Sequence, residues 1–281
     1  MKYLGWIAAG AVVVALLAFL IIDSGKDNEQ PSASAGGTAG VTVPTITAPA
    51  PSPTGNAAVD ALRASVPVPD VHINPPPSAQ RGRSFALATV RTGQRIALHA
   101  SPGGRVLQRV GDKTEFGSMR VFWIERVSGA WFGVPTPDLP NGQLAWIKDD
   151  RIALDLTQTR FWITADLSRR VLELRYGNRM LQRMRVTVGS SSSPTPLGNY
   201  AVTDGLVGRG LGPWYGCCVL ALSGHQAQLP SGWIGGNRIA IHGTPGSVGG
   251  ADSHGCLRAS DPDMIALFAR VPLGTPVFIR A

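Results

Sequence analysis

Residues 239–244 read IAIHGT, and residues 253–258 read SHGCLR. The first run is apolar and ends close to a histidine, which is typical of a buried strand that carries a polar side chain into a site. A glycine-rich loop at 246–250 separates the two runs, and Cys256 follows His242 by 14 residues. Because glycines let the chain turn back, we expect the histidine and the cysteine to meet.

Cys256 and His242 together indicate nucleophilic catalysis. A cysteine attacks as the thiolate, and a nearby imidazole takes its proton and later returns it to a leaving amine. Gly255 permits an unusual backbone angle before the cysteine, and amides of that loop are candidate donors to an oxyanion. A structural cysteine with structural histidines, or a zinc site, are the alternatives. The H-x-C spacing is uncommon for zinc, so we expect neither a metal nor a cofactor.

The whole string resembles the catalytic motif of L,D-transpeptidases of the YkuD type. That motif is a histidine, a variable loop, then Ser/Thr-His-Gly-Cys, an apolar residue and Asn or Arg; here it is His242 followed by residues 253–258. Residues 188–189 (VG) and 194–200 (PTPLGNY) resemble the second strand-and-turn signature of the family. The resemblance covers about residues 161–280 and implies a mostly-β domain with the cysteine in a cleft.

The same resemblance implies a two-step acyl transfer on peptidoglycan stem peptides. Cys256 would attack the carbonyl after the L-centre at position three of a stem tetrapeptide and release the terminal D-alanine. An amine of a neighbouring stem would then take the acyl group and form a 3–3 cross-link. If water takes it instead, the same acyl-enzyme makes the protein an L,D-carboxypeptidase.

The family motif also implies roles for the residues around the cysteine. His242 is expected to act as general base and acid, and His254 is counted with the catalytic side chains. Ser253 and Gly255 would shape the cysteine loop and the oxyanion site. The expected substrate-binding residues are Arg258, Gly243 and Thr244.

Three other classes of protein share some of these features. A sortase also uses His, Cys and Arg in that order, but its histidine and cysteine lie much further apart and its arginine is on a later strand. A papain-like hydrolase places the cysteine before the histidine, which His242 and Cys256 reverse. A non-catalytic cell-wall-binding protein has no need of a thiolate.

Residues 3–22 form an uncharged apolar stretch of about 20 residues, which as a helix spans roughly 30 Å, the thickness of a bilayer core. We expect residues 1–24 to be a single-pass transmembrane helix in the cytoplasmic membrane of a bacterium. A cleaved signal peptide is the alternative, but the nearest A-x-A is at 33–35. Residues 25–82 are rich in Pro, Ala, Ser, Thr and Gly and predict a disordered linker, so the bulk of the chain would be extracytoplasmic.

Residues 83–156 predict a small all-β barrel. Residues 130–134 (AWFGV) and 145–147 (AWI) resemble bacterial SH3-like domains. The three tryptophans of this segment are expected in its core, with a ligand groove as the alternative. Short apolar runs recur at hairpin spacing between turn signals, at 85–90, 95–99, 106–110, 121–127, 131–134 and 144–148.

Residues 157–281 predict the catalytic domain, which is also rich in strands and has one short helix near its end. Asp261 would cap that helix and Pro262 suits its first turn. The neighbouring cysteines Cys217 and Cys218 are expected to be free or separately partnered, because a disulfide between adjacent residues is strained; such a disulfide, in an oxidising compartment, is the alternative. The predicted strands are 161–166, 171–176, 184–188, 200–202, 219–222, 239–242 and 277–280.

The composition narrows the class of protein and its partners. With 34 glycines and 22 prolines a helical bundle is a poor interpretation, and three cysteines cannot make a disulfide scaffold. The net charge is +8, and arginines crowd the predicted hairpin at 169–185. Outside a membrane, anionic cell-wall polymers are the expected counterpart and nucleic acid is not. We expect a monomer.

Overall fold

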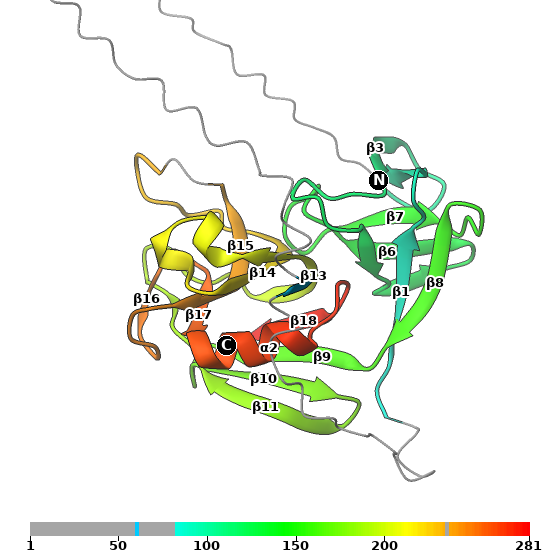
Figure 1. The fold of residues 1–281 in the computed structure, drawn as a ribbon. Coiled ribbons are helices and arrows are strands. Elements are labelled where there is room, and N and C mark those ends of the chain that lie inside the picture. The colour runs from blue at the N-terminus through cyan, green and yellow to red at the C-terminus, as the bar shows by residue number, and fades with distance from the viewer. Residues whose placement is uncertain (1–59, 62–81, 234–235) are drawn as a thin grey trace, which may run out of the picture. The chain divides into compact units, whose positions relative to one another are not determined.

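The structure is a computed structural model that describes residues 60–61, 82–233 and 236–281 (Figure 1). These residues belong to one compact unit, Pro49–Ala281. The fold is mostly β with a short C-terminal helix, as the sequence predicts. The expected anchor at 1–24 lies outside the described residues, as does nearly all of the expected linker at 25–82. In the described part, no helix is long and apolar enough to cross a membrane.

Eight strands form two antiparallel sheets in the first part of the described chain. Their strand orders are β3-β2-β7-β6-β5 and β4-β1-β8. One apolar core lies between them and includes Val90, Leu98 and Ile147, which are fully buried. The strands are β1 (Phe85–Val90), β2 (Arg95–His99), β3 (Val106–Gly111), β4 (Val121–Trp123), β5 (Arg126–Ser128), β6 (Trp131–Pro135), β7 (Leu144–Lys148) and β8 (Leu154–Thr159).

The single strand predicted at 121–127 is wrong, because the chain changes sheets within it. β4 pairs with β1, whereas β5 pairs with β6. Between them, the N–H of Ile124 donates to Ala86 and the N–H of Glu125 donates to Gly133, each at 2.9 Å. The other five predicted strands of this segment are confirmed, with ends within one residue.

The resemblance of this part to an SH3-like barrel stays a prediction. Strand β8 pairs with β1 along its whole length, and the boundary expected between residues 156 and 157 falls inside it. Trp123 is buried, as expected, and its ring meets Phe278 edge-on with centroids 5.5 Å apart. Trp131 and Trp146 are half-buried. Phe278 lies on β18, so apolar packing joins the first sheets to the C-terminal one.

The C-terminal part is built on an eight-stranded sheet. Its strand order is β11-β10-β9-β18-β13-β14-β15-β17, and β12 pairs with β16 beside it. Its core includes Leu172, Leu220 and Ile241, all fully buried. The elements are β9 (Phe161–Asp166), β10 (Val171–Tyr176), β11 (Arg179–Arg185), β12 (Val188–Gly189), β13 (Gly198–Val207), η2 (Gly208–Gly210), η3 (Pro213–Tyr215), β14 (Cys218–His225), β15 (Arg238–Thr244), β16 (Ala251–Ser253), β17 (Leu257–Ser260), α2 (Asp261–Arg270) and β18 (Pro276–Arg280).

One predicted strand of this part is divided in the structure, and β13 and β14 extend beyond the predicted 200–202 and 219–222. The run 184–188 is divided between β11, which pairs with β10, and the short β12, which pairs with β16. Thr187 lies between them and forms an isolated bridge with Arg258. The apolar pattern could not distinguish one strand from two, because both lie against the same core.

Helix α2 begins at Asp261, whereas a cap at Asp261, as predicted, would start the helix at Pro262. Ser260, and not Asp261, is the N-cap, because the Ser260 hydroxyl accepts a hydrogen bond from the N–H of Asp263 at 3.3 Å. Met264 and Phe268 are buried on its apolar side, as the sequence predicts. The helix lies against β14, β15 and β17, and thereby supports the strand that bears His242 (Figure 1).

Leu220→Ala should lower the free energy of unfolding by about 2–5 kcal/mol, since it empties a fully buried site at the centre of the sheet. Leu197→Ala is the matched control, because Leu197 is 56% exposed; it should change stability by less than about 0.5 kcal/mol. Chemical denaturation of the two variants measures both values. Equal losses would contradict the placement of the core.

Candidate active site

The parallel pairing of β15 with β17 brings the two motif runs together. His242 lies opposite Arg258 in the register, and Ile241 lies opposite Leu257. A parallel pair needs a crossover of about a dozen residues, which the glycine-rich loop and β16 supply. Cys256 directly precedes β17 and therefore lies beside the strand that carries the histidine.

His242 is buried and neutral at physiological pH. Its Nδ1 lies 2.6 Å from the carbonyl oxygen of Gly243. A carbonyl only accepts, so Nδ1 carries the proton and Nε2 keeps its lone pair. Burial lowers the pKa of His242 to about 4; the charge of Arg258 lowers it as well, and the Gly243 hydrogen bond and Asp261 oppose the shift. The imidazole is therefore set up to accept a proton at Nε2.

Cys256 is the free cysteine of the described chain and is half-buried. Burial raises the pKa of its thiol, while a backbone hydrogen bond from Ala240 and the positive charge of Arg258 lower it. Burial thus favours the neutral thiol and the neutral imidazole over the thiolate–imidazolium ion pair.

The loop before the cysteine is held by hydrogen bonds of Ser253. The fully buried Ser253 donates from Oγ to the carbonyl of Cys256 at 2.6 Å, and accepts from the N–H of Gly255 at 3.1 Å. Gly255 has a φ of +106°, which other residues rarely adopt, and a Cβ there would overlap Gln226. Because its N–H is bound to Ser253, Gly255 is positioned to shape the loop rather than to donate to an oxyanion.

Gln226 is a contributor that the sequence did not indicate. It is buried, and its Nε2 donates to the carbonyl of Pro194 at 2.8 Å and to that of His254 at 3.4 Å. It therefore joins the PTPLGNY turn to the cysteine loop. A lone glutamine at the end of a strand carries no motif, so nothing in the sequence could have identified it.

The remaining predicted residues take different places. His254 is exposed, and its ring lies 5.0 Å from that of Trp233. Thr244 lines the cavity described below and accepts at Oγ1 from the N–H of Gly246 at 3.2 Å. Arg258 is mostly buried and lies 3.8 Å from the exposed carboxylate of Asp252. Gly243 is not among the residues that line the cavity, and its carbonyl accepts the hydrogen bond from Nδ1 of His242.

One cavity of about 390 Å³ joins these groups. Apolar atoms make most of the surface of its wall, and several polar side chains converge on it, a combination typical of a ligand site. Its reactive lining residues come from both motif runs, and its aromatic ones come from two loops outside the motif. They are His242, Thr244, Cys256 and Arg258, and Trp214, Tyr215 and Trp233.

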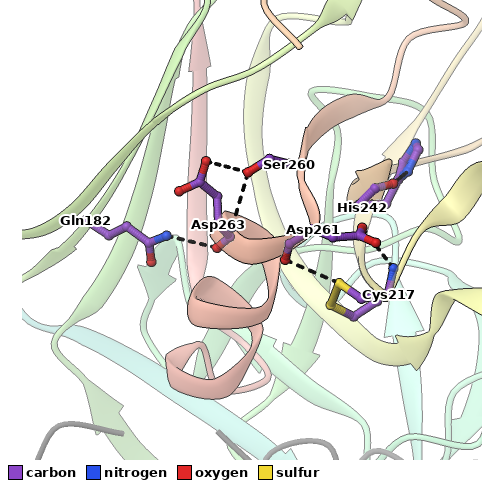
Figure 2. Close-up of a disulfide and its surroundings, with 8 residues drawn as sticks. Gln182, Cys217, His242, Ser260, Asp261 and Asp263 are labelled. Carbon is purple, nitrogen blue, oxygen red and sulfur yellow. Dashed lines mark hydrogen bonds between the residues drawn. A yellow bond between two sulfur atoms is a disulfide. The ribbon is translucent and has the colours of Figure 1, made fainter. Parts of the chain in front are cut away.

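The expectation that Cys217 and Cys218 are free or separately partnered is wrong. A disulfide joins them, at the start of β14. Figure 2 shows this disulfide between the start of α2 and the strand of His242. No group of three metal-binding side chains was found within residues 82–233 and 236–281.

The comparisons with known proteins concern the C-terminal part. The model of the YkuD family, the L,D-transpeptidase catalytic domain, matches residues 160–279. Two curated relatives, from Bacillus subtilis and Bacillus licheniformis, carry the provisional name L,D-transpeptidase YkuD. The first is 31% identical over 122 residues, which are 43% of this chain and 66% of the relative. The second is 32% identical over 119 residues, which are 42% of this chain and 64% of the relative.

A solved structure of an L,D-transpeptidase from Mycobacterium smegmatis is also similar. It shares 20% identity over 57% of this chain and 89% of that chain, with a TM-score of 0.35. The matched part of the chain spans just under two thirds of the length of each of the two Bacillus relatives. The family model and the relatives support the predicted L,D-transpeptidase catalytic domain.

The His242 imidazole should titrate with a midpoint of about 4, because burial disfavours its charged form. NMR of the histidine side-chain nitrogens, followed from pH 3 to pH 8, measures this midpoint. His242→Gln identifies the resonance by removing it. A midpoint near the ordinary value of about 6.5 would show that the ring is not buried as described.

Proposed function

On the basis of an L,D-transpeptidase catalytic domain at residues 160–279, we propose that the protein forms 3–3 cross-links in peptidoglycan through an acyl-enzyme on Cys256. One observation supports this proposal above the others: His242, neutral and with Nε2 unprotonated, lines the same cavity as the free thiol of Cys256. That pair is what a cysteine acyltransferase needs before substrate arrives.

In the first half-reaction, Nε2 of His242 removes the proton of the Cys256 thiol as the sulfur attacks the carbonyl carbon of the third stem residue. The C–N bond to the terminal D-alanine breaks, and the imidazolium gives its proton to the leaving amine. A thioester joins Cys256 to the stem. Starting from the neutral pair costs little desolvation, because charge develops only in the transition state.

In the second half-reaction, a side-chain amine of another stem attacks the thioester. His242 now takes a proton from the amine and returns it to the sulfur as the new amide forms and the thiolate leaves. Water in place of the amine gives the L,D-carboxypeptidase outcome through the same intermediate. The balance between the two depends on which nucleophile the cavity admits.

Arg258 is assigned to charge control beside the reacting pair. Its positive charge lowers the pKa of both Cys256 and His242, so it favours the thiolate and disfavours a resting imidazolium. The guanidinium also lines the cavity and can hold a carboxylate of the donor stem. Ser253 and Gly255 keep the cysteine loop in shape, and His254 borders the open side of the cavity.

The cellular setting is part of the same proposal. Residues 3–22 would anchor the chain in the bacterial cytoplasmic membrane, and the linker to residue 82 would let the folded part reach the wall outside it. Wall polymers are the proposed macromolecular partner, and an SH3-like segment before residue 157 would bind or brace against them. The protein is proposed to act as a monomer.

A carbapenem should acylate the protein once, at Cys256. Intact-mass spectrometry of the oxidised protein measures the adduct, and peptide mapping places it. Cys256→Ala should abolish it, and His242→Gln should slow its formation by about 10²-fold or more, since the general base is lost. An adduct on Cys217 or Cys218, or one that survives Cys256→Ala, would refute the nucleophile.

A stem tetrapeptide should separate the two outcomes of the acyl-enzyme. We expect a cross-linked dimer and free D-alanine, measured by liquid chromatography with mass spectrometry. Free tripeptide without dimer would make the protein an L,D-carboxypeptidase. The Cys256→Ala protein serves as the control for contaminating hydrolases.

A further inference from the structure

The turn before the disulfide brings an aromatic side chain to the catalytic histidine. Tyr215 is the last residue of η3, and its ring centroid lies 5.0 Å from that of His242. Tyr215 also lines the cavity that holds Cys256. Burial raises the pKa of Tyr215, and the charge of a Cys256 thiolate raises it further, which agrees with the closeness of the two groups. This turn therefore forms the cavity wall next to the reacting pair.

Asp261 fastens this turn to helix α2. It is the first residue of the helix, and its Oδ1 accepts a hydrogen bond from the N–H of Cys217 at 3.0 Å. The Cys217 sulfur lies 3.7 Å from the carbonyl oxygen of the same aspartate. Figure 2 shows the carboxylate reaching from the start of the helix to the Cys217 amide, with His242 beside it. The Asp261 side chain thus connects α2 to Cys217, which lies two residues after Tyr215.

Two glycines make room for the carboxylate. A Cβ at Gly216 or at Gly243 would overlap Oδ1 of Asp261. Gly216 also has a φ of +56°, the left-handed region that favours glycine. Gly243 holds His242 through its carbonyl. The carboxylate therefore fills the space between the turn and the strand end that fixes the histidine.

Asp263 lies two residues away and has a different task. Its carboxylate accepts from the Ser260 hydroxyl at 2.7 Å, and its N–H donates to the same hydroxyl at 3.3 Å. Both carboxylates occupy the first helical turn, where negative charge is favourable. Only Asp261 bonds to the turn that carries Tyr215, so Asp263 provides a matched control.

We propose that Asp261 is a positioning residue of the active site, which holds the Cys217 amide and thereby fixes Tyr215 against His242 beside Cys256. The inference rests on the proposed function for its assay, since the effect is measured on acylation of Cys256. The sequence assigned Asp261 only to the helix cap, a task that belongs to Ser260. Asp261 does not touch the reacting atoms; it acts through the turn, and its charge only partly offsets the lowering of the His242 pKa by burial.

Four variants test the hydrogen bond, with the second-order rate constant of carbapenem acylation as the readout. Asp261→Ala should slow acylation by about 10-fold or more, because small displacements of a reacting site are costly. Asp261→Asn keeps an acceptor at the same reach and should stay within about 3-fold of the unaltered protein. Asp261→Glu keeps the charge but displaces the acceptor, so it should resemble the alanine variant. Asp263→Ala should lower the melting temperature without slowing acylation.

A double-mutant cycle tests whether Asp261 works through the tyrosine. If it does, Asp261→Ala should cost less than about 2-fold in a Tyr215→Ala background, because the wall that it positions is already gone. If the double variant instead loses acylation rate by the product of the two single losses, the proposal is overturned, since Asp261 would then act independently of Tyr215.

The remaining outcomes are decisive as well. The positioning role is overturned if the Asp261→Ala protein is acylated at the rate of the unaltered protein. It is also overturned if the Asp261→Asn protein is acylated no faster than the Asp261→Glu protein. If the alanine variant fails to fold, the comparison of Asn with Glu still decides, since both keep a polar side chain at that position. If the unaltered protein is not acylated at Cys256, the proposed function fails instead. Alkylation of the Cys256 thiol by iodoacetamide then replaces the carbapenem in the same comparison.

Discussion

The parallel pairing of β15 with β17 is the interaction on which the site depends. It sets His242 opposite Arg258, and it puts Cys256 where the loop rejoins the sheet. The sheet fixes this register because one face of β15 packs on a core that includes Ile241, and a one-residue shift would turn His242 over to the other face. Helix α2 supports the pair, and its first residue contacts the turn that completes the cavity.

Burial is the physical effect that governs the chemistry at rest. It lowers the pKa of His242 and raises that of Cys256, so it favours the neutral form of both groups. Arg258 opposes burial at the thiol and adds to it at the imidazole. In the proposed mechanism, a neutral imidazole beside a thiol avoids a buried ion pair and leaves the charge separation to the moment of attack.

The local elements were largely predictable, because apolar runs and turn residues act over a few positions. Most strands and the helix at 261–270 follow from them. The errors arose where distant partners decide the structure. The run 121–127 splits between two sheets, and 184–188 divides at the bridge to Arg258. The state of Cys217 and Cys218 also depended on a turn geometry that no local pattern reveals.

The sequence by itself determined the reactive groups: a histidine, a cysteine 14 residues later and the glycine-rich loop between them form one continuous stretch, and their spacing survives folding. The tertiary structure alone decided their surroundings. Gln226 and Tyr215 come from separate loops and contact His254 and His242 of the motif, and Asp261 at a helix start binds the amide of Cys217, two residues after Tyr215. Such contacts depend on which strands pair and how closely the backbones approach. The order of residues along the chain reveals neither the pairing nor the approach.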